Sequence, residues 1–297
     1  MRAPEATSTV DFAPRAIARL PPASPRQRGS VTWERRLLGW HSLLCYLFLY
    51  VPILILILYS FNRSKQTAGW DGFTLDWYGR LFANDLILRA VKNSLIVAVS
   101  ATIFATIIGT MVALALARRS FRGKGATQSA LYLPIIIPEI VIGAALVTFF
   151  GVIELRLSLW TVVLAHIAFC ISYVAIVVRA RLAGFDRSLE EAASDLGAGP
   201  LDTFRRVTLP IILPGIIAGA LLVFTISIDD YVVSSFVAGV GATTLPIQIY
   251  SMLKVGVTPE VNAVSTLLLL LTVVLIAIAQ RLQQDPTPSL SKGARKK

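Results

Sequence analysis

Charge-free stretches of the chain are long enough to cross a lipid bilayer. Four runs contain no Asp, Glu, Lys or Arg: residues 37–62, 93–117, 157–178 and 261–280. Two further apolar runs, 126–153 and 209–228, are interrupted or bounded by acidic residues. Because a membrane-spanning helix needs about 20 apolar residues, the pattern predicts an all-α membrane protein of about six transmembrane helices. The expected spans are about 37–61, 92–117, 126–152, 157–179, 209–235 and 260–281.

The composition fits a chain that is mostly surrounded by lipid. Hydrophobic residues make up 55% and charged residues 15% of the 297 residues, whereas an ordinary soluble domain is about 25% charged. The membrane domain is expected to cover residues 33–283. Residues 1–32 are rich in Ala, Pro, Ser and Arg without an apolar period, and they predict a disordered cytoplasmic tail. Residues 284–297 predict a second flexible cytoplasmic tail.

The net charge of +11 is explained by membrane topology rather than by binding to nucleic acid. The six predicted spans place 21 of the 28 Lys and Arg residues in the two tails and in the second and fourth loops. Positive residues concentrate on the cytoplasmic side of membrane proteins, so we expect both termini to be cytoplasmic in a multi-pass protein of the inner (plasma) membrane. A short basic cluster is expected to touch lipid headgroups: Arg118, Arg119, Arg122 and Lys124.

Three spans carry signals of close packing or broken helices. The second span has small residues at four-residue intervals, which predicts close contact with a neighbouring helix: Ala101, Ala105, Gly109, Ala113 and Ala117. The third span contains Pro134 and Pro138, and the fifth begins with Pro210 and Pro214. Proline removes a backbone donor and bends or ends a helix, and broken helices in membranes border cavities or tight protein packing.

The segment between the fourth and fifth spans, residues 186–210, predicts two short helices on the cytoplasmic surface. Ser188 lies three residues before Glu191, which is the spacing of a capping box. Apolar residues then recur at helical spacing: Leu189, Ala193 and Leu196. Gly197 and Gly199 favour a turn, and Pro200 suits the start of a second helix. Such a protrusion fits a groove on a partner protein, with Glu190 and Glu191 contacting basic groups at its rim.

These residues resemble the EAA loop of ABC importer permeases. The matching positions are Glu191-Ala192-Ala193, Gly197 and the run Val207-x-Leu209-Pro210, with valine where isoleucine is usual. Over residues 38–280 four more segments look like the second permease of spermidine/putrescine importers: Trp77-Tyr78, Asn93-Ser94-Leu95, Ser227-x-Asp229-Asp230 and Gly241–Pro246. The resemblance implies a type I importer fold and an importer that carries polyamines. It also implies a heterodimer with a second permease, two cytoplasmic ATPases that dock on the EAA helices, and an external substrate-binding protein.

The sequence contains no pattern for catalysis or cofactor binding. Gly123-Lys124-Gly125 lacks the spacing and the following Ser or Thr of a phosphate loop, and no nucleophile elbow or zinc motif occurs. Cys45, Cys170, His41 and His166 are isolated, so a disulfide or metal site is not expected and the histidines are interpreted as helix-packing residues. We therefore expect a permease that binds no cofactor and no metal, with ATP and Mg²⁺ held by the partner ATPases.

Acidic residues within the spans are candidates for the substrate pathway, because such groups are costly in a bilayer and usually face the protein interior. Glu139 is expected near the midplane beside Pro138. Asp229 and Asp230 are expected near the outer end of the fifth span, with Asp230 on a face shared with Ser227 and Ser234. Their carboxylates would replace the hydration of a polyamine while Tyr231 contacts its methylene chain. The alternative is structural: a neutral, hydrogen-bonded Glu139 and an aspartate pair that caps a helix.

Other functions remain open at this stage. A similar permease could carry ferric iron or an opine-like amino acid, and the sequence does not choose between them. A secondary transporter would show an inverted repeat and paired coupling-ion sites, which the sequence lacks. A membrane enzyme finds no support in any motif.

Overall fold

A computed structural model describes residues 31–65 and 69–283. The chain forms two compact units, the first ending at Pro52 and the second starting at Ile53. The helix α1 (Val31–Tyr59) contains this boundary and has Pro52 inside it. The predicted tails, residues 1–32 and 284–297, lie outside the described residues except for Val31 and Thr32, which begin α1.

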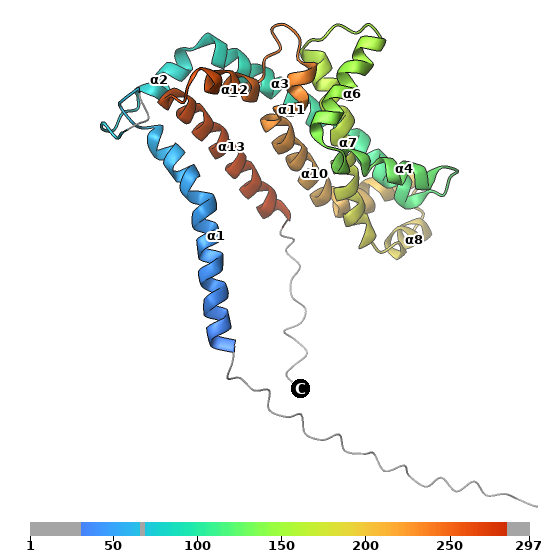
Figure 1. The fold of residues 1–297 in the computed structure, drawn as a ribbon. Helices are drawn as coiled ribbons and strands as arrows, with labels where there is room; N and C mark the ends of the chain where they lie inside the picture. The colour runs from blue at the N-terminus through green and yellow to red at the C-terminus, as the bar shows by residue number, and fades with distance from the viewer. Residues whose placement is uncertain (1–30, 66–68, 284–297) are drawn as a thin grey trace, which may run out of the picture. The chain divides into compact units, whose positions relative to one another are not determined.

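The second unit is built from helices (Figure 1). In chain order they are α2 (Asp76–Ala83), α3 (Asp85–Arg118), α4 (Lys124–Ala130), α5 (Leu133–Ile136), α6 (Glu139–Val152), α7 (Leu159–Ala183), α8 (Ser188–Asp195), α9 (Pro200–Thr203), the π-helical turn η1 (Phe204–Thr208), α10 (Leu209–Asp229), α11 (Val232–Val237), α12 (Leu245–Val255) and α13 (Pro259–Gln283).

Five helical stretches of the described residues are long and apolar enough to cross a membrane: Arg35–Tyr59, Asp85–Arg118, Leu159–Ala183, Pro200–Asp229 and Pro259–Ile278. A sixth candidate covers the span expected at 126–152 and is broken, because Lys124–Ile136 and Glu139–Val152 meet at an angle of 112°. The two prolines explain the bend. Pro134 lies in the first turn of α5 and Pro138 precedes α6, and neither can donate the hydrogen bond that a continuous helix needs.

The core of the second unit lies where α3, α7 and α10 pack together. Ala101, Ala105 and Ala113 of α3 are fully buried. A Cβ atom added to Gly109 would lie 2.7 Å from Cβ of Val174 on α7. The small side chains therefore let the two helices approach closely, which confirms the packing predicted from their four-residue spacing.

The predicted fifth span, 209–235, differs from the structure at both ends. Its start is continuous with α9 through η1, so helical structure runs from Pro200 to Asp229. Its end comes at Asp230, whose extended backbone (φ −66°, ψ 120°) separates α10 from α11. Ser227 and Ser234 thus belong to different helices.

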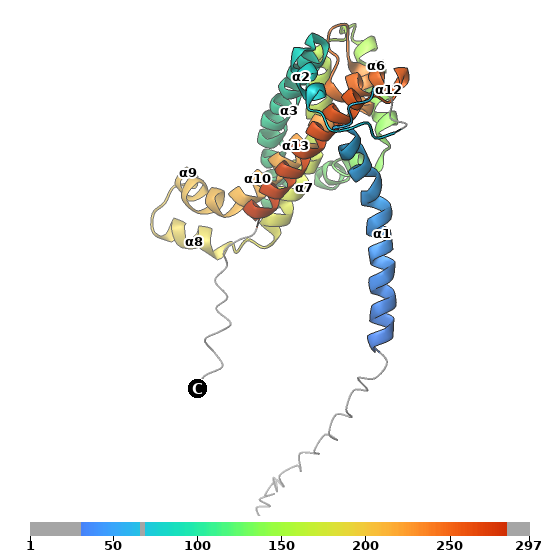
Figure 2. The same ribbon diagram turned by 90° about the vertical axis from the view of Figure 1, so that its left-hand side faces the viewer.

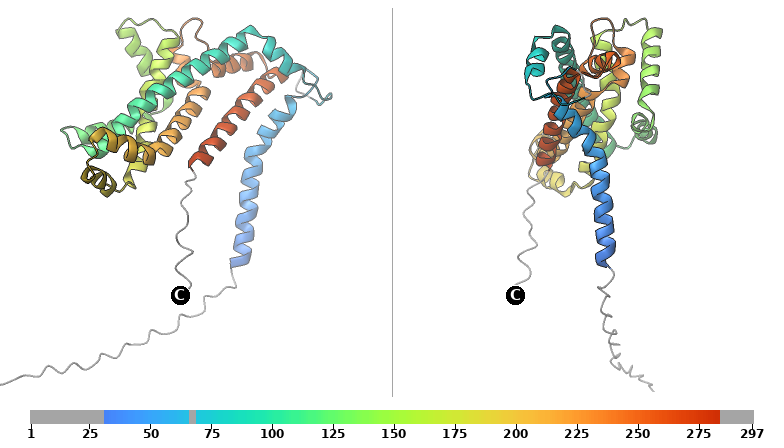
Figure 3. Two further views of the ribbon diagram at one scale, coloured as in Figure 1. Left: turned by 180° about the vertical axis from the view of Figure 1, so that it is seen from behind. Right: turned by 60° about the vertical axis from the view of Figure 1, so that its left-hand side comes forward.

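Short helices gather at the two ends of the α3–α7–α10 core (Figures 2 and 3). The helices α2, α11 and α12 lie at one end. The helices α4, α8 and α9 lie at the opposite end, where the last turn of α3 and the first turn of α10 are also found. We call this the α8 end.

Candidate functional site

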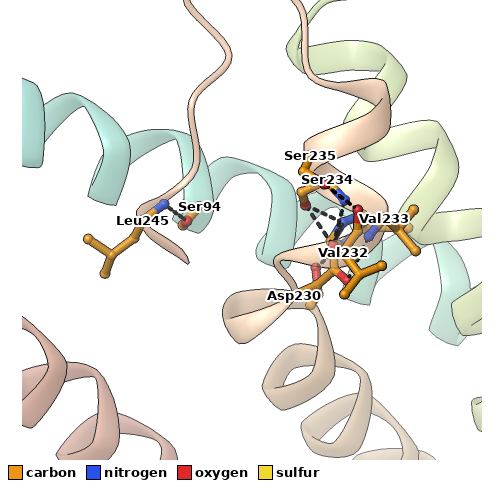
Figure 4. Close-up of polar contacts among 9 residues, drawn as sticks. Ser94, Asp230, Val232, Val233, Ser234, Ser235 and Leu245 are labelled. Atoms are coloured by element: carbon orange, nitrogen blue, oxygen red, sulfur yellow. Dashed lines mark hydrogen bonds and ion pairs between the residues drawn. The ribbon is translucent and has the colours of Figure 1, made fainter. Parts of the chain in front are cut away.

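Asp230 is part of a buried polar network (Figure 4). Its carboxylate accepts hydrogen bonds from the backbone amides of Val233 (3.2 Å) and Ser234 (2.8 Å) and from the Ser234 hydroxyl (2.7 Å). These bonds satisfy the first amides of α11, as an N-terminal cap does. Asp230 thus has the capping role that was the structural alternative to a place in the substrate pathway.

His166 completes this network from α7. Its Nδ1 atom lies 2.7 Å from the Ser227 hydroxyl, and its Nε2 atom lies 3.0 Å from the Ser234 hydroxyl and 3.2 Å from the Asp230 carboxylate. The imidazole is fully buried, and both ring nitrogens have partners. The prediction of a satisfied packing histidine is confirmed, and the ring joins α7, α10 and α11.

Asp229 points elsewhere, as expected for adjacent residues with different orientations. It is exposed and lines a groove of about 500 Å³ together with residues of α12 and α13. The rings of Tyr231 and Tyr250 lie 4.5 Å apart at this groove. The Lys254 ammonium lies 4.9 Å from the centre of the Tyr250 ring. We call this feature the Asp229 groove; it presents a carboxylate beside aromatic rings.

Glu139 is the first residue of α6 and directly follows the break at Pro138. The bend at Pro138 places it at a helix N-terminus, where a carboxylate is favourable. It is exposed. Of the three predicted pathway acids, Glu139 and Asp229 are exposed and Asp230 is buried.

The segments that resemble spermidine/putrescine permeases meet at the end opposite α8. The Asn93 side chain donates hydrogen bonds to the carbonyls of Gly241 (3.0 Å) and Thr243 (2.9 Å). The Ser94 hydroxyl accepts one from the Leu245 amide at 2.8 Å (Figure 4), and Trp77 packs in the same buried cluster as Leu245. These residues fix the loop before α12 to α3, which supports the wall of the Asp229 groove.

The loop of residues 186–210, which we call the coupling loop, forms α8 and α9 as predicted but with a different cap. The expected Ser188–Glu191 capping box is absent from this described segment, because Ser188 is already inside the helix. Instead the Asp186 carboxylate accepts a hydrogen bond from the Ser188 amide at 2.9 Å. This bond lowers the pKa of Asp186 below its usual value.

Gly197 ends α8 in the left-handed conformation, with φ +84°. Its amide donates to the Ser194 carbonyl at 2.9 Å, and the Ala198 amide donates to the Ala193 carbonyl at 3.0 Å. These bonds satisfy carbonyls that have no partner within the helix. Pro200 then opens α9, which continues into η1 and into α10 at Leu209 and Pro210. The second short helix is therefore the first part of a continuous helical stretch, Pro200–Asp229, that is long enough to cross the membrane.

The two glutamates of α8 have different environments. The Glu190 carboxylate binds the guanidinium of Arg118 and the hydroxyl of Thr208, and Arg118 also donates to Thr208 at 2.9 Å. Glu190 therefore holds α8 against α3 and η1. The sequence had instead predicted that it contacts basic groups at the rim of a partner's groove. Glu191 and Ala192 are exposed, so they remain available to a partner.

Apolar side chains of the coupling loop lie uncovered. Leu196 is 90% exposed, Leu201 is 68% exposed and Leu189 is 46% exposed. Figure 2 shows α8 and α9 projecting from the α8 end of the helices. Because large exposed apolar patches mark interaction sites, this surface is suited to a protein partner.

Sequence reasoning missed three residues that shape these sites: Arg118, Tyr250 and Lys254. Arg118 was interpreted only as a lipid contact, and its pairing with Glu190 joins residues 72 positions apart. Tyr250 and Lys254 follow the Gly241–Pro246 segment by one helical turn or more. The sequence signal that could have found them is the spacing of Tyr250 and Lys254, an aromatic and a basic residue four positions apart.

The chain is similar to known transport proteins in sequence and in fold. Residues 105–286 match the family "Binding-protein-dependent transport system inner membrane component". The chain is 44% identical over 253 residues to the spermidine/putrescine transport system permease protein PotC of Escherichia coli (strain K12), covering 85% of this chain and 96% of that protein. It is also 44% identical to the putrescine transport system permease protein PotI of the same strain, over 234 residues that cover 76% and 83% of the two chains.

Solved structures show the same fold. A chain of a bacterial ABC transporter involved in the import of the acidic polysaccharide alginate has a TM-score of 0.68 at 19% identity, covering 86% of this chain and 96% of that one. A chain of the MetNI methionine ABC transporter has a TM-score of 0.55 at 22% identity, covering 66% and 94%. By fold, family match and extended similarity to curated permeases, this chain belongs to the family of inner membrane components of binding-protein-dependent transport systems.

Proposed function

We propose that this chain is a permease subunit of an ATP-driven ABC importer that carries polyamines, putrescine or spermidine, into the cytoplasm. The observation that carries the proposal is the 44% identity to a spermidine/putrescine permease along 85% of the chain. The Asp229 groove supplies chemistry that suits this cargo.

A polyamine is a flexible cation with ammonium groups separated by methylene chains. The Asp229 carboxylate offers charge to replace the hydration of an ammonium. The Tyr231 and Tyr250 rings offer faces for the methylenes and for a second ammonium, because cations bind over aromatic rings. Tyr250 already holds the Lys254 ammonium in this way. The groove therefore supports recognition of organic cations.

The coupling loop supports partnership with ATPase subunits. Its exposed residues Glu191, Ala192, Leu196 and Leu201 form a protruding surface of the kind that fits a groove. In the assembly that we propose, two cytoplasmic ATPases hold ATP and Mg²⁺, a second permease completes a heterodimer, and an external binding protein delivers the cargo. The α8 end and both termini then face the cytoplasm.

Substituting the groove acid tests the cargo. In the complete complex reconstituted in proteoliposomes, Asp229→Asn is expected to lower kcat/KM for labelled putrescine and spermidine by about 10–100-fold, because an ammonium–carboxylate contact contributes about 1.5–3 kcal/mol. Glu139→Gln is expected to lower kcat/KM by a smaller factor, because Glu139 does not line the groove and would attract the cation only over a longer distance.

The matched control is Glu154→Gln, which removes an exposed carboxylate that does not line the groove. Its uptake should equal that of the unsubstituted complex. Near-normal polyamine transport by both Asp229→Asn and Glu139→Gln would exclude the groove as a cation site.

A further inference from the structure

A polar pocket lies at the α8 end, where the last turns of α3 and α7 meet the coupling loop. Its volume is about 340 Å³. The charged residues of its lining come from three elements: Arg118 of α3, Arg179 of α7, and Arg187 and Glu190 at α8. The other lining residues are Ala117, Leu182, Ala183 and Phe185. Nothing in the transport function proposed above uses this pocket.

The pocket carries excess positive charge. Its lining contains three arginines and one glutamate, so positive side chains of the lining outnumber negative ones by two. Glu190 is already bound by Arg118 and Thr208, so it does not compensate the other two arginines. Arg187 donates one hydrogen bond, to the Ala117 carbonyl at 2.8 Å, and a guanidinium has five N–H donors.

Arg179 provides the second observation. Its Nη1 atom is buried and has no hydrogen-bond partner within residues 31–65 and 69–283. Buried polar groups in folded proteins almost always have a partner, and an unpaired charged donor is especially costly. A donor of this kind in the wall of a positively charged pocket indicates that an acceptor from outside the chain belongs there.

We propose that this pocket binds a phosphate group. Guanidinium groups bind phosphate oxygens with two parallel hydrogen bonds, and the arginines of the lining belong to different parts of the chain, α3, α7 and the residue before α8. The pocket lies at the end of two helices that are long enough to span the membrane, so both a phospholipid headgroup and phosphate from solution are candidate sources of this group. Basic pockets between transmembrane helices bind anionic headgroups elsewhere. This proposal does not depend on the cargo.

A phosphate bound in this pocket would lie next to the coupling loop. Arg118 contacts Glu190 of α8 and Thr208 of η1, and Arg187 immediately precedes α8. An anion held by Arg179 and Arg187 would therefore tie the base of α8 to α7. It would stabilise the placement of the coupling loop.

Thermal unfolding of the purified complex in a neutral detergent tests the proposal. Dioctanoyl phosphatidylglycerol, dioctanoyl phosphatidylcholine and inorganic phosphate are titrated separately at constant ionic strength. We expect a saturable rise in Tm with phosphatidylglycerol or with inorganic phosphate. Arg179→Gln is expected to weaken the apparent affinity about tenfold or more, because charge-assisted hydrogen bonds to phosphate are lost.

Arg156→Gln is the control, because Arg156 is exposed and does not line the pocket; its titration should be unchanged. A response to phosphatidylglycerol alone would identify a headgroup site, and a response to inorganic phosphate would identify a site open to solution. If Arg179→Gln prevents assembly, Arg187→Gln takes its place. The proposal is overturned if neither phosphatidylglycerol nor inorganic phosphate stabilises the complex, or if phosphatidylcholine alone does so. It is also overturned if the pocket variant and the control variant respond equally.

Discussion

Replacing Gly197 with valine is expected to lower ATP-driven uptake at least tenfold while the transmembrane helices stay folded. Gly197 has φ +84°, where a residue with a side chain costs about 1–2 kcal/mol and a β-branched residue more. There is open space around the position, so the strain is in the backbone and not in a clash. Relief of that strain changes the turn that directs α8 toward its partner. Uptake and ATPase activity of the reconstituted complex measure the effect.

A second variant, with asparagine at position 197, shows whether an effect on uptake comes from backbone strain or from the loss of glycine itself. Asn tolerates the left-handed conformation better than other residues, so Gly197→Asn should retain most of the uptake. Equal transport by the valine and unsubstituted complexes would show that the geometry of the turn does not transmit work from ATP hydrolysis.

The second large effect is expected at Asp230, and it is an effect on folding. Asp230→Ala removes the cap of α11 and leaves buried donors of Ser234 and His166 without their acceptor. A lost cap and an unsatisfied buried donor cost about 2–4 kcal/mol together. We expect the amount of folded protein in the membrane to fall sharply, as measured by detergent extraction and size-exclusion chromatography.

The neighbouring residue is the matched control. Asp229 is exposed, so Asp229→Ala should leave the amount of folded protein unchanged and impair only transport. Normal folding of Asp230→Ala together with loss of polyamine uptake would contradict the structural role and return Asp230 to the substrate pathway.

Local sequence patterns predicted the helices well because a span is defined by its own composition. Charge-free runs located the long helices, and the small residues around Gly109 predicted the close contact with α7 that the structure contains. Pro134 and Pro138 predicted a broken helix, although the bend of 112° depends on packing that periodicity does not report. The break at Asp230 carried no proline or glycine signal and was missed.

Side-chain partners were harder to predict because they come from distant parts of the chain. Glu190 and Glu191 are equivalent in sequence terms, and only the approach of Arg118 distinguishes them. The adjacent aspartates at the end of α10 differ in the same way, because His166 lies beside one of them. The helix cap of α8 was misplaced by two residues, since Asp186 and Ser188 are both good caps and local pattern does not rank them.

The most direct test of the account is uptake of labelled putrescine and spermidine by proteoliposomes that contain this chain with and without its ATPase partners. The account predicts accumulation only when the complete complex, its binding protein and ATP on the coupling-loop side are all present. Transport at the full rate by the permease chains alone, or a complete and ATP-hydrolysing complex that accumulates neither polyamine, would contradict it.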